Sequence, residues 1–484
     1  MPQPVVPNEI WSQILRYVPR IHQTKLLEVS HLFHDIALDL VFSAVKIYFL
    51  EGEQAYNFLN TSHGDFVEMY AEDLVTRSYE ILRRIIRDPA FAQVVKSVTV
   101  IAFSDSTSIF EQLTIADALA ALPHLRSFRW CGVHPRLTDA VARHIPNTIQ
   151  SMNLQTYVPS IQVIQKFNSI NHLAFAIPFL YPDDEEAHDT TVLDDDIRSA
   201  VNPTHFNDVL SSMNSLSLQS LTLDGECLSG MPVRVLSRLK ELSICITTDC
   251  ENLALDLVYR HAPQLQSLSI VGLIGQEIFP ILVANASCLP CLHSFRLTCD
   301  NMTMGVAPDS EWLDSLFDFI GERTNLRRLY IRIPSINLDG TTRHLSLLQK
   351  LKHLEVFGVH TGDTVVDDRF LTQLLDVLPR ELKAFHLGME WVGGPLLTMV
   401  DHLAAFSSLT FAHFYGASYR LPIQVMDLVT DIPTLQLVGL NRALWDVDRS
   451  DRDPEIKKWP RWKVKFCTVE DFDSHDQYWL FQYN

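Results

Sequence analysis

A pair of cysteines and a pair of histidines are the residues best suited to chemistry. Cys288 and Cys291 form one C-x-x-C pattern, with His293 and Cys299 nearby. Thiolates at this spacing can bind zinc or act as a redox pair. However, the sequence holds no second pair at zinc spacing, and Cys291 directly precedes an apolar position of a repeated pattern. We therefore expect core thiols here, not a metal or redox site.

The two histidines, His386 and His413, occupy the same position in consecutive repeats, which predicts side chains about 5 Å apart on neighbouring strands. They could share a proton or a metal ion, but the missing third ligand favours a structural role. Eight carboxylates between Asp183 and Asp196 lack the glycine and the spacing of a calcium loop, so we expect a solvated segment.

Motifs for phosphate loops, dinucleotide binding, hydrolase nucleophiles and zinc proteases are missing from the sequence. We therefore predict that the chain is not an enzyme. The predicted sets of catalytic residues, metal ligands and cofactors are empty.

The composition is that of a globular chain with more than one structural unit: 484 residues, 47% hydrophobic and 20% charged. The net charge of -19 opposes binding to nucleic acid and to anionic membranes, so we expect neither as a partner. We find no signal peptide and no apolar run of about 18 residues. The eight scattered cysteines fit a reducing compartment, and we expect a location in the cytoplasm, the nucleus or both.

A short repeat organises most of the chain. It reads apolar, two others, apolar, one other, apolar, and it returns fourteen times over about 370 residues. Clear copies begin at Leu218, Leu239, Leu265, Leu292, Leu326, Leu351 and Leu382. Weaker copies begin at Val95, Leu125, Ile149, Ile170, Leu409, Leu435 and Trp459. The starts lie 21 to 34 residues apart except for one interval of 48, which leaves room for a missed copy.

Each copy predicts one short strand, because apolar and other residues alternate over its last three positions. A segment with helical spacing of apolar residues usually precedes the strand, as in residues 312–320, 370–378 and 396–406. Helix, turn and strand repeated with one hand predict an α/β fold with parallel strands inside, helices outside and a cap at each end. The pattern resembles the leucine-rich repeat family of the irregular kind, which implies a horseshoe. The family's ninth-position Asn or Cys is found only as Cys467, so a regular asparagine ladder is not expected.

The N-terminal segment VPNEIWSQILRYVP, residues 6–19, has one wide apolar helical face. A second helical pattern follows it, and Val45, Ile47 and Phe49 then alternate like a first strand. The helical cluster of residues 6–42 is too small to stand alone. Its apolar face either caps the repeats or meets another protein.

These helices resemble an F-box, and with the repeats the chain resembles F-box/leucine-rich-repeat proteins of the fungal type. The matching positions are Pro7, Glu9, Ile10, Ile14, Leu15, Val29, Ser30 and Phe33. His22, Gln23 and Thr24 depart from the pattern, since an apolar pair normally starts the second helix. The resemblance implies docking on the Skp adaptor of a cullin-RING ubiquitin ligase. The residues implied to form or directly support the docking face are Pro7, Ile10, Ile14, Leu15, Val29 and Phe33.

The third, fifth and seventh positions of each copy should line the concave face, because strand side chains alternate. Early copies carry small or neutral residues there, whereas later ones carry arginines, histidines and aromatics. The candidates for target binding are Arg296, Arg328, Tyr330, Arg332, His386, His413 and Tyr415. The same register places Phe357 and Lys463 on this face. Such residues suit an acidic or phosphorylated segment; the alternative is solvated side chains paired with nearby carboxylates.

The sequence therefore predicts four parts. They are an F-box-like domain over residues 1–42, a helical linker and cap over 43–93, repeats over 94–466 with an acidic insertion near 183–208, and a C-terminal cap over 467–484. The expected function is substrate recognition for a Skp–cullin–F-box ubiquitin ligase, with an unknown target protein on the concave face. The alternative is a leucine-rich scaffold without a ubiquitin role, whose N-terminal helices only cap the repeats.

Overall fold

The computed structural model describes residues 6–18, 20–52, 64–104, 109–156, 158–175, 203–213, 217–246, 253–274, 278–285, 287–299, 310–333, 342–365, 368–391, 397–416, 421–450 and 453–482. The chain forms two compact units, residues 1–222 and 223–484. The predicted acidic insertion lies mostly outside the described residues, apart from the start of helix α11.

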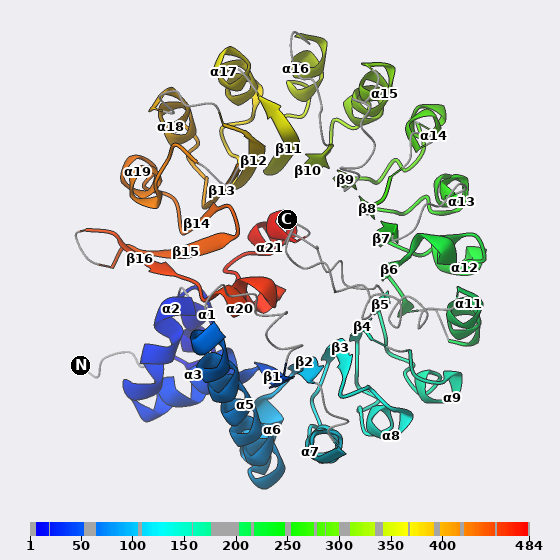
Figure 1. Ribbon diagram of the computed structural model, residues 1–484, viewed down its shortest axis with the longest axis vertical. Coiled ribbons are helices and arrows are strands. Elements are labelled where there is room, and N and C mark those ends of the chain that lie inside the picture. The colour runs from blue at the N-terminus through cyan, green and yellow to red at the C-terminus, as the bar shows by residue number, and fades with distance from the viewer. Residues whose placement is uncertain are drawn as a thin grey trace. The chain divides into compact units, whose positions relative to one another are not determined.

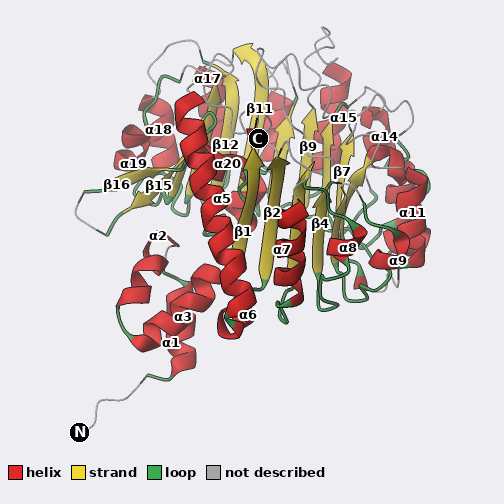
Figure 2. Cartoon of the chain, turned by 60° about the horizontal axis from the view of Figure 1, so that its bottom comes forward, coloured by secondary structure: helices red, strands yellow, loops and turns green. Residues whose placement is uncertain are grey.

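Unit 1 begins with a cluster of short helices (Figure 2). They are α1 (Asn8–Arg16), α2 (Arg20–Gln23), η1 (Thr24–Glu28) and α3 (His31–Phe42). Helix α3 starts at Ser30, whose hydroxyl accepts a hydrogen bond from the backbone N–H of Phe33 at 3.2 Å. The 24-residue helix α5 (Gly64–Arg87) packs against the first strand, and α6 (Pro89–Val94) follows it.

The strands of unit 1 pair in parallel and in chain order. They are β1 (Ala44–Glu51), β2 (Ser97–Ser104), β3 (Ser127–His134), β4 (Ser151–Gln155), β5 (His172–Phe175) and β6 (Ser220–Asp224), of which the last reaches the start of unit 2. The helices between them are α7 (Ile109–Ala120), α8 (Asp139–Ala142), α9 (Ile161–Ile164) and α11 (Pro203–Ser212). Because β5 pairs directly with β6, the copy suggested as missed in the 48-residue interval adds no strand to the sheet between these two.

Unit 2 continues the same alternation (Figure 1). Its parallel strands are β7 (Glu241–Ile246), β8 (Ser267–Gly272), β9 (Ser294–Cys299), β10 (Arg328–Arg332), β11 (Val356–Val365), β12 (Ala384–Glu390), β13 (Phe411–Gly416) and β14 (Leu437–Leu440). Its helices are η3 (Gly225–Leu228), α12 (Val233–Leu236), α13 (Leu255–His261), α14 (Ile278–Ala284), α15 (Ser310–Gly321), α16 (Thr342–Leu348), α17 (Asp368–Val377), α18 (Leu397–Ala404) and α19 (Val425–Asp431).

Unit 2 ends with antiparallel and helical elements. Strands β15 (Ala443–Asp448) and β16 (Glu455–Lys458) pair antiparallel next to β14. The last elements are α20 (Arg461–Lys465), η5 (Val469–Asp471) and α21 (His475–Phe481).

The repeat pattern explains the core. In the copy that begins at Leu265, the side chains of Leu265, Leu268 and Ile270 are fully buried between the sheet and its covering helices. Ser267 and Ser269 alternate with them and point to the opposite face, which we call the concave face. The leucine-rich-repeat architecture predicted from the sequence is therefore confirmed.

Main-chain hydrogen bonds tie successive repeats together without an asparagine ladder. The carbonyl of His293 accepts from the backbone N–H groups of both Arg327 and Arg328, at 2.7 and 3.1 Å. The carbonyl of Arg327 does the same for Glu355 and Val356 in the next repeat. These bonds satisfy the backbone polar groups at the entrances of β10 and β11.

Two of the predicted copies are misplaced. The strand expected from Leu351 begins at Val356, so the true copy starts at Leu354 and Phe357 is buried on the helix side, paired with Leu329. The last expected copy, at Trp459, is not a strand, because residues 461–465, including Lys463, form helix α20.

Candidate functional site

The first candidate surface lies on helix α1. Pro7 supplies the N-cap with φ -57°, and its carbonyl accepts from the backbone N–H of Ile10 at 3.1 Å. Glu9 in the first turn and Arg16 in the last turn both complement the helix dipole. The sequence therefore specifies this helix locally as well as through its apolar face.

The apolar residues of α1 divide between two sides. Ile10 and Ile14, one turn apart, are 43% and 45% exposed, and Tyr17 at the end of the helix is 89% exposed. Val29, at the end of η1, is 58% exposed. Pro7 is exposed as well. Four of the six residues implied by the F-box resemblance thus lie on the surface, and Tyr17 is a further exposed aromatic that the motif did not mark.

The other two residues support the helix from inside. Leu15 is buried, so the expectation that it faces a partner together with Ile10 and Ile14 is wrong, and it can only support the docking face. Phe33 is half-buried, and its ring meets the edge of Trp11 with centroids 5.1 Å apart. Where the F-box pattern departs, Gln23 is buried and its side-chain amide donates to the carbonyl of Val18 at 3.0 Å. A hydrogen bond therefore stands where the family has apolar packing.

The second candidate surface is the concave face of unit 2, where the strand register aligns the predicted target-binding residues in rows. The first row runs from β9 to β14 as Ser294, Arg328, Val356, Ala384, Phe411 and Leu437. The second row is Arg296, Tyr330, Gly358, His386, His413 and Gly439. The third row is Thr298, Arg332, His360, Gly388 and Tyr415. All seven predicted residues therefore come together on one face.

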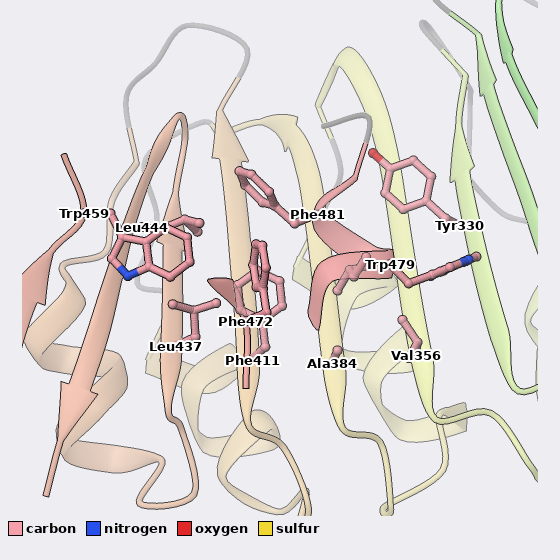
Figure 3. Close-up of a cluster of buried hydrophobic side chains, with 11 residues drawn as sticks. Tyr330, Val356, Ala384, Phe411, Leu437, Leu444, Trp459, Phe472, Trp479 and Phe481 are labelled. Carbon is pink, nitrogen blue, oxygen red and sulfur yellow. The ribbon is translucent and has the colours of Figure 1, made fainter. Parts of the chain in front are cut away.

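Helix α21 lies over the part of the first two rows that belongs to β9–β13 (Figure 3). The guanidinium of Arg296 lies over two rings, 4.4 Å from the centroid of Tyr330 and 4.6 Å from that of Trp479, and it donates to the carbonyl of Trp479. Arg328 forms an ion pair with Asp476, with Nη2 at 2.6 Å and Nε at 2.8 Å from Oδ1. These contacts join the later strands to the last turns of the chain.

A network of histidines lies under this cover. Nδ1 of His386 and Nδ1 of His413 are 2.9 Å apart, and Nε2 of His413 is 2.7 Å from the carbonyl of Asn441. Because a carbonyl only accepts, Nε2 of His413 must donate to it. Nδ1 of neutral His413 then accepts the proton of Nδ1 of His386, which leaves Nε2 of His386 as a buried lone pair without a hydrogen bond.

Burial keeps these histidines neutral. Desolvation lowers the pKa of His413 to about 4 and that of His360 to about 3, with the charge of Arg332 adding to the effect on His360. Burial and the neighbouring His413 also hold the pKa of His386 well below its usual value. The ring of His360 is 5.9 Å from that of His386 and 5.3 Å from that of Tyr415. The expected pairing of His386 and His413 is thus present as a hydrogen-bonded core element.

The seven predicted target-binding residues differ in accessibility. Arg296, Tyr330, His386 and His413 are buried, whereas Arg328, Arg332 and Tyr415 are half-buried. A partner could touch the four buried residues only after α21 had moved. The sequence interpretation missed the residues that cover them, Asp476, Trp479, Leu480 and Phe481, although the aromatic run YWLF marked the segment as more apolar than an ordinary cap.

The cysteines are the remaining chemical candidates. Of the seven cysteines in the described residues, three are buried, whereas Cys288 is half-buried and Cys291 is exposed, so the expectation of core thiols fails at this pair. Sγ of Cys288 lies 3.7 Å from the side-chain oxygen of Asn285. Within the part of the chain that the structure describes, no group of three or more His, Cys, Asp or Glu side chains is placed to hold a metal ion. No helix in that part is both long and apolar enough to cross a bilayer.

Comparisons with known proteins found similarity among solved structures only. No family model matches the chain, and no curated protein matches it. Among solved structures, it is similar to the crystal structure of a TLR13–ssRNA13 complex, with 12% sequence identity and a TM-score of 0.30. That alignment covers 75% of this chain and 53% of the other, so the chain spans about half the length of that protein.

Proposed function

We propose that this chain is a substrate receptor of a Skp–cullin–F-box type ubiquitin ligase. Helix α1 and the turn before α3 dock on the Skp adaptor, and the repeats present a target protein. The observation that carries the proposal is the exposure of four large apolar side chains in one short part of the F-box-like segment. They are Ile10, Ile14, Tyr17 and Val29.

Cap function alone does not account for this exposure. A helix that only closes a solenoid buries its apolar side and presents a polar outer face. Here Leu15 and Trp11 already fill the inner side of α1, and the outer side still carries two isoleucines one turn apart. Exposed apolar groups of this kind are typical of protein–protein contacts.

The chemical contribution of such a receptor is proximity. The repeats would hold the target near an enzyme on another subunit and so raise its effective concentration there. The chain needs no catalytic group of its own for this role.

The decisive experiment is co-purification of the full-length chain with the Skp adaptor. Ile10→Asp and Ile14→Asp should abolish the complex or weaken it by about 30-fold each, because a buried aliphatic anchor contributes about 2 kcal/mol or more to binding. Phe110→Asp is the matched control: Phe110 is 80% exposed on α7, also in unit 1, and its change should leave binding unaltered.

Equal loss in all three variants would point to damaged folding, which the thermal unfolding of each variant reports. If the folded wild-type chain does not bind the adaptor, the ligase proposal fails. The chain would then be a leucine-rich interaction scaffold whose first helices only cap the repeats.

A further inference from the structure

The last helix of the chain lies on the concave face like a bound ligand. Figure 3 shows Trp479 and Phe481 of α21 over the side chains of Val356, Ala384 and Phe411. In leucine-rich repeats the concave face is the surface left free by the helices, so this segment fills the place of a partner.

The apolar contacts of α21 come from three consecutive residues. Trp479, Leu480 and Phe481 are all buried, and Phe481 packs 5.5 Å from the ring of His413 and 5.9 Å from that of Phe472. Without these side chains, Val356, Ala384 and the neighbouring part of Phe411 would present an apolar strip to water. The strip therefore requires an occupant with large apolar side chains.

The polar contacts give the occupant a direction and a charge. Asp476 pairs with Arg328, and Trp479 is flanked by the guanidinium groups of Arg296 and Arg328, at 4.6 and 6.0 Å from its ring centroid. The side-chain amide of Gln477 lies 3.4 Å from the hydroxyl of Thr410. An acidic residue followed three positions later by tryptophan is thus matched by two arginines on neighbouring strands.

A glycine makes room for this occupant. A Cβ on Gly358 would lie 2.4 Å from the ring of Tyr330 and 3.0 Å from Cδ1 of Leu480. Only a residue without a side chain lets the tyrosine ring lean over β11 while leucine packs on it. The surface is therefore fitted to the shape of the helix as well as to its charge.

The helix itself is not built into the sheet. Strands β9 to β14 hydrogen-bond to one another, whereas α21 contacts them through side chains and through carbonyls that accept from Arg296. A seven-residue helix is not stable alone. Its order depends on these anchors, and its departure would break no strand pairing.

From this we propose that the concave face of β9–β13 binds a short helical segment of a partner protein, with an acidic residue, tryptophan three positions later, and two apolar residues after it. Helix α21 is a tethered copy of that ligand and closes the site until the partner displaces it. The proposal rests on the concave face as the target-binding surface, and it does not depend on adaptor docking.

Because α21 is covalently linked to the site that it covers, the test must first weaken its binding there. A linked segment acts at an effective concentration of about millimolar, so a free peptide cannot compete with intact α21. We suggest the full-length Trp479→Ala chain, in which the anchor is lost, and a fluorescent peptide of residues 473–482 as the probe. The peptide should bind this variant at least tenfold more tightly than the wild-type chain, and a peptide that itself carries Trp479→Ala should not bind.

A charge reversal tests the site itself. Adding Arg328→Asp to the Trp479→Ala chain should reverse the preference, so that a peptide with Asp476→Arg binds at least tenfold better than the native peptide. Arg327→Asp in the same background is the matched control, because Arg327 pairs with Glu355, with Nη2 2.7 Å from Oε2, and should leave the preference unchanged.

Failure of the peptide to bind a folded Trp479→Ala chain would overturn the proposal. If that variant does not fold, hydrogen exchange of the wild-type chain decides: α21 amides should exchange at least a hundredfold faster than those of β11, and equal rates would make α21 an integral part of the core. Dimers of the wild-type chain formed by exchange of α21 would identify a second copy as the occupant and also overturn the partner assignment. Adaptor binding enters none of these measurements, so their failure leaves the ligase proposal standing.

Discussion

The buried histidines of unit 2 make its stability depend on pH. In the unfolded chain His360, His386 and His413 have ordinary pKa values near 6.5, whereas in the folded chain all three are lowered, to about 3 for His360 and about 4 for His413. Below about pH 6.5 the unfolded state therefore binds more protons than the folded state, and stability falls as pH falls.

This difference gives a measurable slope. We expect each of the three histidines to remove about 1 kcal/mol of unfolding free energy per pH unit between about pH 6 and pH 4.5. The slope from urea unfolding should become shallower by about one third in His360→Phe, relative to the wild-type chain. An unchanged slope in the His360 variant would show that this residue keeps an ordinary pKa in the folded chain.

The position of the His360 ring requires a residue without a side chain at Gly388. A Cβ on Gly388 would lie 2.2 Å from Cδ2 of His360, and the ring is held between His386 and Tyr415. Gly388→Ala should therefore reduce the unfolding free energy by about 1 to 3 kcal/mol, as overpacking does. In a His360→Ala background Gly388→Ala should cost less than it does in the wild-type chain, because the ring it would clash with is gone. Equal costs in the two backgrounds would mean that contact with the His360 ring is not the cause of the loss.

At the scale of single elements, one hydroxyl connects the fold of α3 to the candidate docking face. Ser30 caps α3 at the N–H of Phe33, and the ring of Phe33 supports Trp11 on α1. Ser30→Ala should destabilise the helical cluster by about 1 kcal/mol and weaken adaptor binding, whereas Ser30→Asp, which can also cap, should preserve both. Thermal unfolding and adaptor titration would check the pair; equal behaviour of the two variants would exclude a capping role.

The elements show which features a local pattern can predict. The strands follow from the alternation around each leucine. The predicted start of one copy is wrong because Leu351 and Leu354 both satisfy the pattern, and only the pairing of β10 with β11 selects Leu354. The shared helix face of Ile10 and Ile14 follows from their spacing of one turn, whereas their exposure, unlike the burial of Leu15, is set by packing on the other helices. The cover of Arg296 by Trp479 joins residues 183 positions apart, so no local periodicity contains it.

At the scale of the whole molecule, stability should be distributed between neighbours. Each repeat buries its apolar positions against the next, and the main-chain bonds that link repeats reach only from one strand entrance to the following one. Such a chain is stabilised by the sum of nearest-neighbour interfaces rather than by one centre. A defect in one repeat should therefore act locally.

Leu268→Ala in β8 tests this distribution. Leu268 is fully buried, so its truncation should cost about 2 to 5 kcal/mol through lost contacts and a cavity. Hydrogen exchange should then accelerate in β7, β8 and β9, whose strands pair with one another, while the amides of β2 and β3 in unit 1 keep their wild-type protection. If all of these strands lose protection by the same factor, the chain unfolds as a single cooperative body. A loss that fades with distance from β8 means instead that one end of the molecule can open for a partner while the other remains folded.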